Sequence, residues 1–499
     1  MEHIYRSYYT NCPAIVNYMV ARLRLEEGQR VMEPCAGGGA FVDALLRAQN
    51  GIEVDSYDIN PAAVTELVRK HGAREGASVH CADPLTDLKL TLLANAGGWY
   101  DRVIGNPPYG GWQEPHKRKA LRRIYPRLYV KETYSLFLYR CVRLLNDGGV
   151  LSFIIPDTYL TLTAHQYLRH FLLTETCIDE ILLFPSSFFP GVAFGYSKLS
   201  IITLRRCANA ISCRENRFRV ISGFQKVEQL GSDDLSHLST QVLTQDEVIH
   251  NIDHAFFVND NPAVGQLINR CEQRVGDVAS CVTGLYTGDD KAFLRRGSLK
   301  VRPGSAYAVV RSDEVYLTPD GANPPLEGLE GPKRFIPIVK GGAARFRKAD
   351  SWFLDWGQAA VDTYKHSSRG RFQNSRFYFK TGIAVPMVSS SRVTAWLLEG
   401  RLFDQSIVGI FPQDPHLLYY LMAFFNSATC NRLIRTINPS ANNSANYLKK
   451  IPFVVPPPEI LARVDGIVKG VLESDSNFQL KVCEAQPLID DIFECVYGV

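Results

Sequence analysis

The chain has 499 residues, 46% of them hydrophobic, so it is long enough to bury at least two independent cores. Charged residues make up 21% and the net charge is only +4, so any nucleic-acid partner has to be indicated by local charge clusters. The chain contains no run of about 18 apolar residues and its first residues lack an apolar signal core, so we expect neither a membrane span nor a secretory signal.

The first 205 residues alternate strand and helix signals. Apolar spacing predicts helices over 13–25, 40–49, 62–70 and 134–145. Short apolar runs predict strands near Val31 and over 53–58, 78–81, 102–104, 149–155, 180–184 and 198–204. This alternation predicts an α/β fold, in which a parallel sheet carries helices on both faces.

The alternation ends near residue 210. Polar, irregular sequence such as GSDDLSHLSTQ follows, and from about Asn261 the chain has short strand signals, many glycines and prolines, and two closing helices. We therefore expect three parts: an α/β domain over 1–210, a connecting region over 211–260, and a second domain over 261–499.

A glycine-rich turn, EPCAGGGAF, lies between the first predicted strand and its helix. Successive glycines allow positive φ and leave room for a ligand to approach the backbone. In a doubly wound sheet this first turn is where a nucleotide-like ligand binds. We expect it to contribute five residues to a cofactor site: Glu33, Pro34, Ala36, Gly37 and Gly39.

Two acids end the next two predicted strands. Asp58 stands 19 residues after Gly39 and could bind ribose hydroxyls, with Ile59 beside it. Asp83, followed by Pro84, could accept a hydrogen bond from an adenine amino group. The turn lacks the G-x-G-x-x-G pattern of dinucleotide sites, which favours S-adenosylmethionine over NAD. The alternative is a tight turn with acids that cap helices.

The most specific motif is Asn106-Pro107-Pro108-Tyr109, which follows a buried strand. The prolines restrict the backbone and remove two donors, so the Asn106 side-chain oxygen and the Pro107 carbonyl are rigid acceptors. Two acceptors that hold the hydrogens of an exocyclic amino group would restore its lone pair for attack on a methyl group. Asn106 is also expected to contact the cofactor, and Tyr109 offers a ring for base stacking. The alternative is a proline-rich surface turn.

These motifs together resemble the γ class of amino-methyltransferases, and in particular the TaqI-like DNA adenine methyltransferases. The resemblance also covers YTNCP near Thr10, YDINP, CADP and SSFFPGVAF, and extends over about residues 8–205. It implies a class I, Rossmann-like domain with a mixed, mainly parallel sheet. It further implies that Thr10 holds the cofactor's methionine carboxylate and that Phe189 stacks on the flipped base, with Phe188 and Phe194 as competitors. Pro84 stands where the family often has phenylalanine.

Local charge favours DNA as the partner. The segments 117–131, 340–348 and 364–380 are rich in lysine and arginine and contain no acids. Basic residues position a phosphate backbone, although a solvated face is the ordinary alternative. From these segments we expect DNA contacts from Lys117, Arg118, Lys119, Arg122, Arg123, Arg345, Arg347, Arg371 and Arg376.

The second half resembles, less sharply, the target-recognition domains attached to TaqI-like enzymes, in VTGLYTGDDKAFL, RFYFKTGI, LMAFFNSATCNRLI and the closing LIDDIFECVYGV. We therefore expect an α+β specificity domain over 261–499. The expected activity is methylation of adenine N6 in duplex DNA, in restriction-modification or phage defence. A methyltransferase for RNA or for a protein glutamine is the alternative, but such glutamine enzymes resemble this chain only as far as the sheet and stop soon after it, whereas 295 residues follow Leu204 here.

Two other classes are weighed against this reading. A DNA-binding protein with a silent methyltransferase fold would have no chemical reason to keep Thr10, Asp58, Asp83 and Asn106 together. Because few residues precede the first cofactor motif, we expect no fused N-terminal nuclease, and a separate restriction endonuclease or defence partner stays open. The twelve cysteines form no CxxC pair, so we expect reduced thiols, no metal site, and a cytoplasmic protein of prokaryotic or phage origin that acts as a monomer on DNA.

Overall fold

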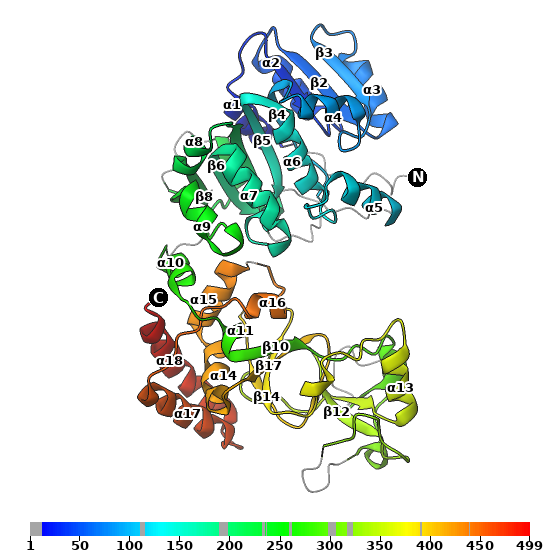
Figure 1. Cartoon of the computed structure of the whole chain (residues 1–499), viewed down its shortest axis with the longest axis vertical. Helices are drawn as coiled ribbons and strands as arrows, with labels where there is room; N and C mark the ends of the chain where they lie inside the picture. Colours follow the sequence, from blue (N-terminus) through cyan, green and yellow to red (C-terminus); the bar gives the residue numbers. More distant parts are fainter. Residues whose placement is uncertain are drawn as a thin grey trace. The chain divides into compact units, whose positions relative to one another are not determined.

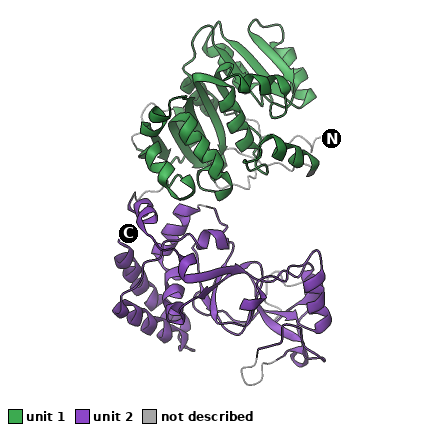
Figure 2. Ribbon diagram, viewed as in Figure 1, with its two compact units in different colours: residues 1–260 green, residues 261–499 purple. Residues whose placement is uncertain are grey.

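The computed structural model describes residues 12–109, 115–188, 198–231, 235, 237–258, 262–297, 306–316, 323–389, 392–438 and 440–499. The chain forms two compact units, residues 1–260 and 261–499 (Figure 2). None of the helices in the described ranges has both the length and the apolar character needed to cross a membrane.

The first unit is built on a nine-stranded sheet in the order β3-β2-β1-β4-β5-β7-β6-β8-β9 (Figure 1). Strands β3, β2, β1, β4, β5, β6 and β8 run one way, whereas β7 and β9 run against them. The predicted α/β class with a mixed, mainly parallel sheet is therefore confirmed. The strands are β1 (Arg30–Glu33), β2 (Glu53–Asp58), β3 (Ala77–Cys81), β4 (Tyr100–Gly105), β5 (Leu145–Pro156), β6 (Thr176–Pro185), β7 (Lys198–Arg206), β8 (Arg217–Ser222) and β9 (Ser239–Thr244).

Two rows of helices cover the sheet. Helices α4, α6 and α7 pack along one face, in front of the strands in Figure 1, and α1 packs against α2 on the other. The central strand β5 has a run of eight buried residues at its end, as expected for a strand covered on both faces. The helices are α1 (Pro13–Leu23), α2 (Ala40–Ala48), α3 (Pro61–His71), α4 (Leu88–Asn95), α5 (Pro115–Ile124), α6 (Thr133–Leu144), α7 (Gln166–Glu175), α8 (Ala210–Glu215) and α9 (Gln245–His250).

Residues 211–260, expected to connect two domains, instead extend this sheet. Strand β8 pairs with β6, and β9 pairs with β8 at the edge. Phe218, Val220 and Ile221 of β8 are each only 1% exposed, so this segment belongs to the core of the first unit. The α/β unit thus runs to residue 260.

The second unit is α+β, as predicted. It has two four-stranded sheets, of order β10-β17-β14-β15 and β11-β13-β12-β16. Trp356 is fully buried in an aromatic cluster with Phe372, Tyr378 and Phe379. The strands are β10 (Ala279–Thr283), β11 (Leu294–Arg296), β12 (Phe335–Val339), β13 (Trp352–Asp355), β14 (Gly382–Pro386), β15 (Trp396–Leu398), β16 (Leu402–Phe403) and β17 (Ile407–Pro412). The helices are α10 (Pro262–Arg270), α11 (Val275–Val278), α12 (Asp290–Phe293), α13 (Gln358–His366), α14 (Leu418–Asn426), α15 (Ala428–Ile437), α16 (Ala445–Leu448), α17 (Pro458–Leu472) and α18 (Phe478–Tyr497).

Candidate functional site

Five polar residues meet at one edge of the first unit's sheet. The strands β3, β2, β1, β4 and β5 are parallel, so the residues at their carboxyl ends lie along the same edge. The strand order reverses between β1 and β4, and ligands of such sheets bind at that reversal. The residues at the edge, in spatial order, are Asp83, Asp58, Glu33, Asn106 and Asp157.

The glycine turn is anchored to the neighbouring strand β2. Gly37 donates its backbone N–H to Asp58 Oδ2 at 2.8 Å, and Ala36 donates to the Tyr57 carbonyl at 2.9 Å. Gly37 and Gly39 have φ values of 50° and 81°, which side chains disfavour. A Cβ on Gly39 would also lie 2.7 Å from Leu67 Cδ2, whereas the Cβ position of Gly38 meets nothing within 4 Å. The turn is therefore fixed on one side and open on the other.

Asp58 organises two loops at once, because its second oxygen, Oδ1, accepts the backbone N–H of Asn60 at 2.8 Å. Ile59, between them, is 44% exposed. Asp83 uses Oδ1 to accept the Leu85 N–H at 3.1 Å, and its Oδ2 pairs with Lys117 Nζ at 3.0 Å. Each carboxylate keeps acceptor capacity, since a carboxylate oxygen can accept more than one hydrogen bond.

Glu33 is buried at the end of β1, with 1% exposure. Burial raises the pKa of its carboxyl well above the ordinary value, and the nearby Asp58 carboxylate raises it further. Glu33 Oε2 has no hydrogen-bond partner among the described residues. A buried acceptor without a donor is costly, so a donor or a cation that arrives in the turn would relieve it.

The Asn106–Tyr109 loop leaves β4 directly beside the glycine turn. A Cβ on Gly105 would lie 3.3 Å from Pro34 Cδ, so the absence of a side chain at Gly105 permits this close approach. Thr133, at the start of α6, donates its hydroxyl to the Pro108 carbonyl at 2.6 Å and fixes the end of the loop. Tyr109 is 2% exposed and lies in the core cluster, so its ring is not an open platform in this structure.

A buried polar cluster beside this loop was not anticipated from the sequence. His165 Nε2 lies 2.8 Å from Glu132 Oε2, which also accepts the Thr158 hydroxyl at 3.0 Å. Burial lowers the pKa of His165, and Glu132 opposes that shift. Burial would raise the pKa of Glu132, but the hydrogen bond with His165 makes it lower than usual. Glu132 immediately precedes Thr133, so the cluster supports the helix end that holds Pro108.

Asp157 is a second residue that the sequence reasoning missed. Asp157 comes directly after β5, just as Asp58 is the last residue of β2. An acid at the carboxyl end of a predicted strand is the sequence feature that could have identified it. It is 8% exposed, and burial raises its pKa to about 6, with Lys198 acting in the opposite direction.

Helix α5 carries the first predicted basic cluster. Its apolar side is anchored by Leu121, which is fully buried, and just beyond the helix Tyr125 donates its hydroxyl to the Leu85 carbonyl at 2.7 Å. Lys117 forms an ion pair with Asp83, and Arg118 is half-buried. The exposed basic residues of the predicted set are therefore Lys119, Arg122 and Arg123.

The predicted basic residues of the second unit include three exposed arginines, Arg347, Arg371 and Arg376, and the less exposed Arg345. Arg345 donates to Gln486 Oε1 at 3.1 Å, and Arg347 pairs with Asp475 at 3.0 Å and lies over the Phe478 ring. These two arginines thus join the loop before β13 to the closing helices. Arg371 and Arg376 are exposed.

Three predicted residues lie outside the described ranges: Thr10, Phe189 and Phe194. Phe188 is described, and its ring stacks on Phe184 with 5.5 Å between the centroids. With 8% exposure, Phe188 is a core residue in this structure.

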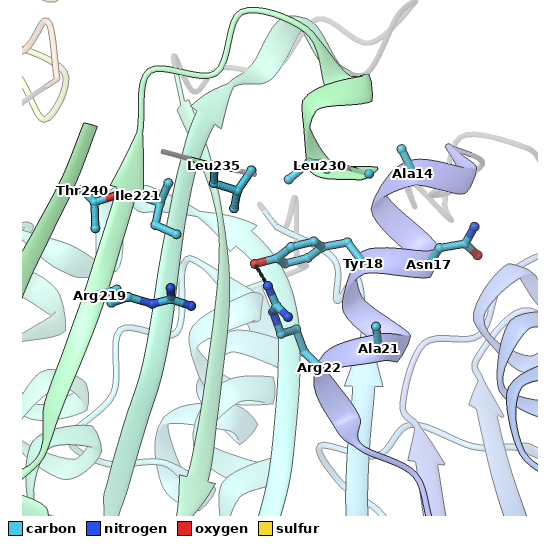
Figure 3. Close-up of a pocket in the computed structure, with 11 residues that line it drawn as sticks. Ala14, Asn17, Tyr18, Ala21, Arg22, Arg219, Ile221, Leu230, Leu235 and Thr240 are labelled. Atoms are coloured by element: carbon cyan, nitrogen blue, oxygen red, sulfur yellow. Dashed lines mark hydrogen bonds between the residues drawn. The ribbon is translucent and has the colours of Figure 1, made fainter. Parts of the chain in front are cut away.

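A pocket of about 630 Å³ lies elsewhere in the first unit, between α1, β8 and β9, and no predicted site residue lines it (Figure 3). Its two cations share one buried carboxylate, because Arg22 and Arg219 both pair with Glu180, at 2.6 and 3.0 Å. Tyr18 also donates its hydroxyl to Glu180. This pocket is separate from the carboxyl edge where the motifs converge.

The comparison with protein families matches part of this unit. Residues 54–189, which run from β2 through the Asn106–Tyr109 loop to the end of β6, match the model of the Eco57I restriction-modification methylase. The match thus includes the candidate catalytic loop and covers less than half of the chain. Family and strand order together agree with the predicted class I methyltransferase fold.

Curated relatives of the chain include type II methyltransferases and an adenine-specific methyltransferase. The chain is 31% identical over 212 residues to the type II methyltransferase M.TthHB8I of Thermus thermophilus, which covers 39% of this chain and 43% of that protein. It is 25% identical over 186 residues to M.HincII of Haemophilus influenzae, covering 36% and 34%. It is 20% identical over 402 residues to the adenine-specific methyltransferase PglX of Lacticaseibacillus casei, covering 76% and 31%. The chain thus spans less than half the length of these relatives.

Solved structures share the fold over both units. The ATP-dependent type ISP restriction-modification enzyme LlaBIII, bound to DNA, matches with a TM-score of 0.56 and 12% identity, over 95% of this chain and 40% of that one. The DrdV–DNA complex matches with a TM-score of 0.53 and 14% identity, over 93% and 57%.

Proposed function

We propose that the chain is a site-specific DNA methyltransferase that transfers a methyl group from S-adenosylmethionine to N6 of a flipped adenine in duplex DNA. The observation that carries the proposal is the Asn106–Tyr109 loop, which leaves β4 at the strand-order reversal with Gly105 against Pro34 of the glycine turn. The match to a restriction-modification methylase family over 54–189 supports it independently.

The residues of the edge fit S-adenosylmethionine. Asp58 and Asp83 offer carboxylates to ribose hydroxyls and to an adenine amino group, and the open side of Gly38 leaves space for the ligand. Glu33, whose Oε2 has no partner among the described residues, suits a positively charged cofactor. The cofactor, when bound, supplies the activated methyl group.

The chain's own part in the reaction is to prepare the amine. The exocyclic nitrogen of adenine is a poor nucleophile because its lone pair is delocalised into the ring. The Asn106 amide oxygen and the Pro107 carbonyl would accept its two hydrogens and direct the lone pair toward the methyl group. Fixed acceptors of this kind act through preorganised electrostatics, so attack requires no prior deprotonation. The Thr133–Pro108 hydrogen bond keeps the acceptors rigid.

The substrate is proposed to be DNA for two reasons. The relatives that match include an adenine-specific methyltransferase, and two fold neighbours were solved with DNA. Exposed basic residues on α5 follow the catalytic loop, and an enzyme that extrudes a base must hold the flanking phosphates. We further propose a role in restriction-modification or phage defence, with the second unit as the target-recognition domain; the restriction-modification family matched over 54–189 supports the first of these roles.

The test is incubation of the full chain with tritiated S-adenosylmethionine and, separately, unmethylated plasmid, tRNA and a release factor. The proposal predicts label in plasmid alone, recovered as N6-methyl-2′-deoxyadenosine after digestion to nucleosides. Label in tRNA or in a glutamine of the release factor would instead favour the alternative substrates, and label as a methylated cytosine would contradict the adenine assignment.

A further inference from the structure

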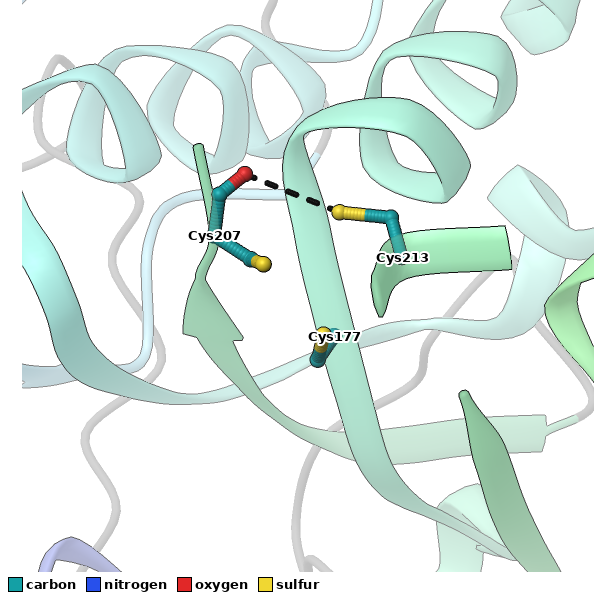
Figure 4. Close-up of side chains that lie close together, drawn as sticks. All are labelled: Cys177, Cys207 and Cys213. Atoms are coloured by element: carbon teal, nitrogen blue, oxygen red, sulfur yellow. Dashed lines mark hydrogen bonds between the residues drawn. The ribbon is translucent and has the colours of Figure 1, made fainter. Parts of the chain in front are cut away.

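Three cysteines converge at the edge of the sheet opposite the candidate site. Cys177 is the second residue of β6, Cys207 follows the last residue of β7, and Cys213 lies in α8 (Figure 4). Their Sγ atoms all lie within 4.8 Å of one another. In the described part of the chain, this is the group of three His, Cys, Asp or Glu side chains that meets the spacing of a metal site.

The fold brings these residues together from separate elements. Strands β6 and β7 are antiparallel neighbours, with Cys177 opposite Arg205, so the start of one strand meets the end of the other. Asn209 then caps α8 by accepting the N–H groups of Ile211 and Ser212, which turns the chain back over the strands. Figure 4 shows the three side chains directed toward a common space.

The spacing of the sulfur atoms suits a single thiophilic ion. A zinc–sulfur bond is about 2.3 Å, so two thiolates on one ion lie about 3.8 Å apart in a tetrahedron and about 4.0 Å apart in a trigonal plane. Sulfur atoms within 4.8 Å of one another need to approach by less than an ångström to reach that arrangement. A disulfide would require about 2.05 Å between two of them and would leave the third cysteine unpaired.

The surroundings of the cluster agree with a closed, structural site. Cys213 is fully buried and Cys177 is 6% exposed, whereas Cys207 is half-buried and gives access to solvent. The thiols contact the carbonyls of Ser212, Asn209 and Cys207 at 3.7, 3.5 and 3.6 Å, so oxygen atoms are at hand for a fourth ligand.

We propose that Cys177, Cys207 and Cys213 bind a structural Zn²⁺ ion, with an oxygen of water or of the 207–212 backbone as the fourth ligand. On binding, three S–H groups release their protons to solvent and three S–Zn bonds form, with no change of oxidation state. The ion would fasten α8 to the start of β6 and the end of β7. Because this edge is opposite the carboxyl edge, the ion stabilises the first unit and takes no part in methyl transfer.

The test uses the full chain, reduced and stripped of metal, and titrated with Cd²⁺ as a spectroscopic substitute for Zn²⁺. We expect one Cd²⁺ per chain to survive desalting and to give thiolate-to-cadmium charge-transfer absorption, and Zn²⁺ to displace it. Cys207→Ser, at the half-buried position, should weaken binding by more than about 100-fold, beyond the loss typical of outer partners of a metal site. Cys483→Ser and Cys495→Ser, at exposed positions of α18, are the matched controls and should leave binding unchanged.

A second readout separates loss of the ion from loss of the fold. Zn²⁺ should raise the thermal midpoint of the unsubstituted chain but not that of Cys207→Ser, while circular dichroism of the two metal-free proteins coincides. Failure to retain Cd²⁺, retention by the triple variant Cys177→Ser/Cys207→Ser/Cys213→Ser, or a disulfide among these cysteines in the freshly reduced protein would each overturn the proposal.

Discussion

At the residue scale, the account depends on the rigidity of Asn106 and the two prolines that follow it. The loop is fixed at its start by the contact of Gly105 with Pro34 and at its end by the hydroxyl of Thr133. Both anchors restrict the acceptor groups before any substrate arrives, which is the condition for preorganised stabilisation.

We predict that Asn106→Ala lowers the rate of methyl transfer by at least about 100- to 1000-fold, the usual effect of losing one preorganised polar group. Affinity for S-adenosylmethionine, measured by calorimetry, should change by less than threefold (roughly 0.6 kcal/mol). Asn50→Ala, at an exposed position after α2, is the control and should keep full activity. Equal loss of cofactor affinity and rate would mean that Asn106 serves binding and not chemistry.

Asp157 gives a prediction on pH. Its pKa is raised to about 6 in the folded chain, so the folded state binds a proton more tightly than the unfolded state does. Ionisation therefore costs stability as pH rises from about 4 to 6, and the cost stays constant above that range. A shift of this size corresponds to about 3 kcal/mol.

We accordingly expect Asp157→Asn to be more stable than the unsubstituted chain above pH 6, by up to that amount, and equally stable near pH 4. Urea unfolding at a series of pH values measures this difference. A variant whose stability relative to the parent did not change with pH would show that Asp157 is ionised at no cost.

Residues with a chemical signature could be predicted from the sequence, whereas residues defined by burial could not. Asp58 and Asp83 follow a glycine turn and a strand, and the structure brings both to the edge with Asn106. Glu132 and His165 are 33 positions apart and meet only in the folded chain, so no sequence spacing indicates them.

At the scale of elements, α5 has one side packed against the core and another side that exposes basic residues, although its sequence shows only one basic run. Leu121 faces the core and the exposed cations lie elsewhere on the helix, so the helix is amphipathic. The comparable run around Arg345 and Arg347 is engaged with α17 and α18. Composition alone cannot distinguish exposed basic residues from basic residues that pair within the protein, because the fold decides which side chains lie close to each cation.

We predict that alanine at Lys119, Arg122 and Arg123 together weakens DNA binding and reduces the slope of log K against log salt by about 3, since each phosphate contact contributes about 0.9. Fluorescence anisotropy at several salt concentrations measures both quantities. Arg347→Ala is the contrasting variant: it should leave the slope unchanged and lower the thermal midpoint of the second unit. An unchanged slope in the triple variant would exclude α5 from the DNA interface.

At the scale of the whole molecule, the order of the strands in the first 205 residues is predictable, because each strand is a short apolar run, whereas helices α4, α5 and α7 were not predicted. The far edge of the sheet, formed by β8 and β9, could not be predicted in this way. Strand β9 is a polar edge strand with little apolar alternation, and β8 is a short apolar run within polar sequence. Both therefore resemble a connecting region in the sequence. Their role becomes visible only through pairing with β6.

Truncation tests this boundary. A chain that ends after residue 260 should be monomeric and bind S-adenosylmethionine, because it retains the complete sheet. A chain that ends after residue 210 should aggregate, since it removes Phe218, Val220 and Ile221 from the core and exposes the edge of β6. Size-exclusion chromatography distinguishes the two, and a well-behaved 1–210 chain would contradict the inclusion of β8 and β9 in the catalytic unit.

The central claim, that the loop after β4 prepares adenine N6 in DNA, is tested most directly in a host that lacks adenine methylation. Long-read sequencing of its DNA after expression of the full chain should show N6-methyladenine at one recurring sequence, and none after expression of Asn106→Ala. Absence of N6-methyladenine with the unsubstituted chain, in cells where the protein is folded and binds S-adenosylmethionine, would contradict the account.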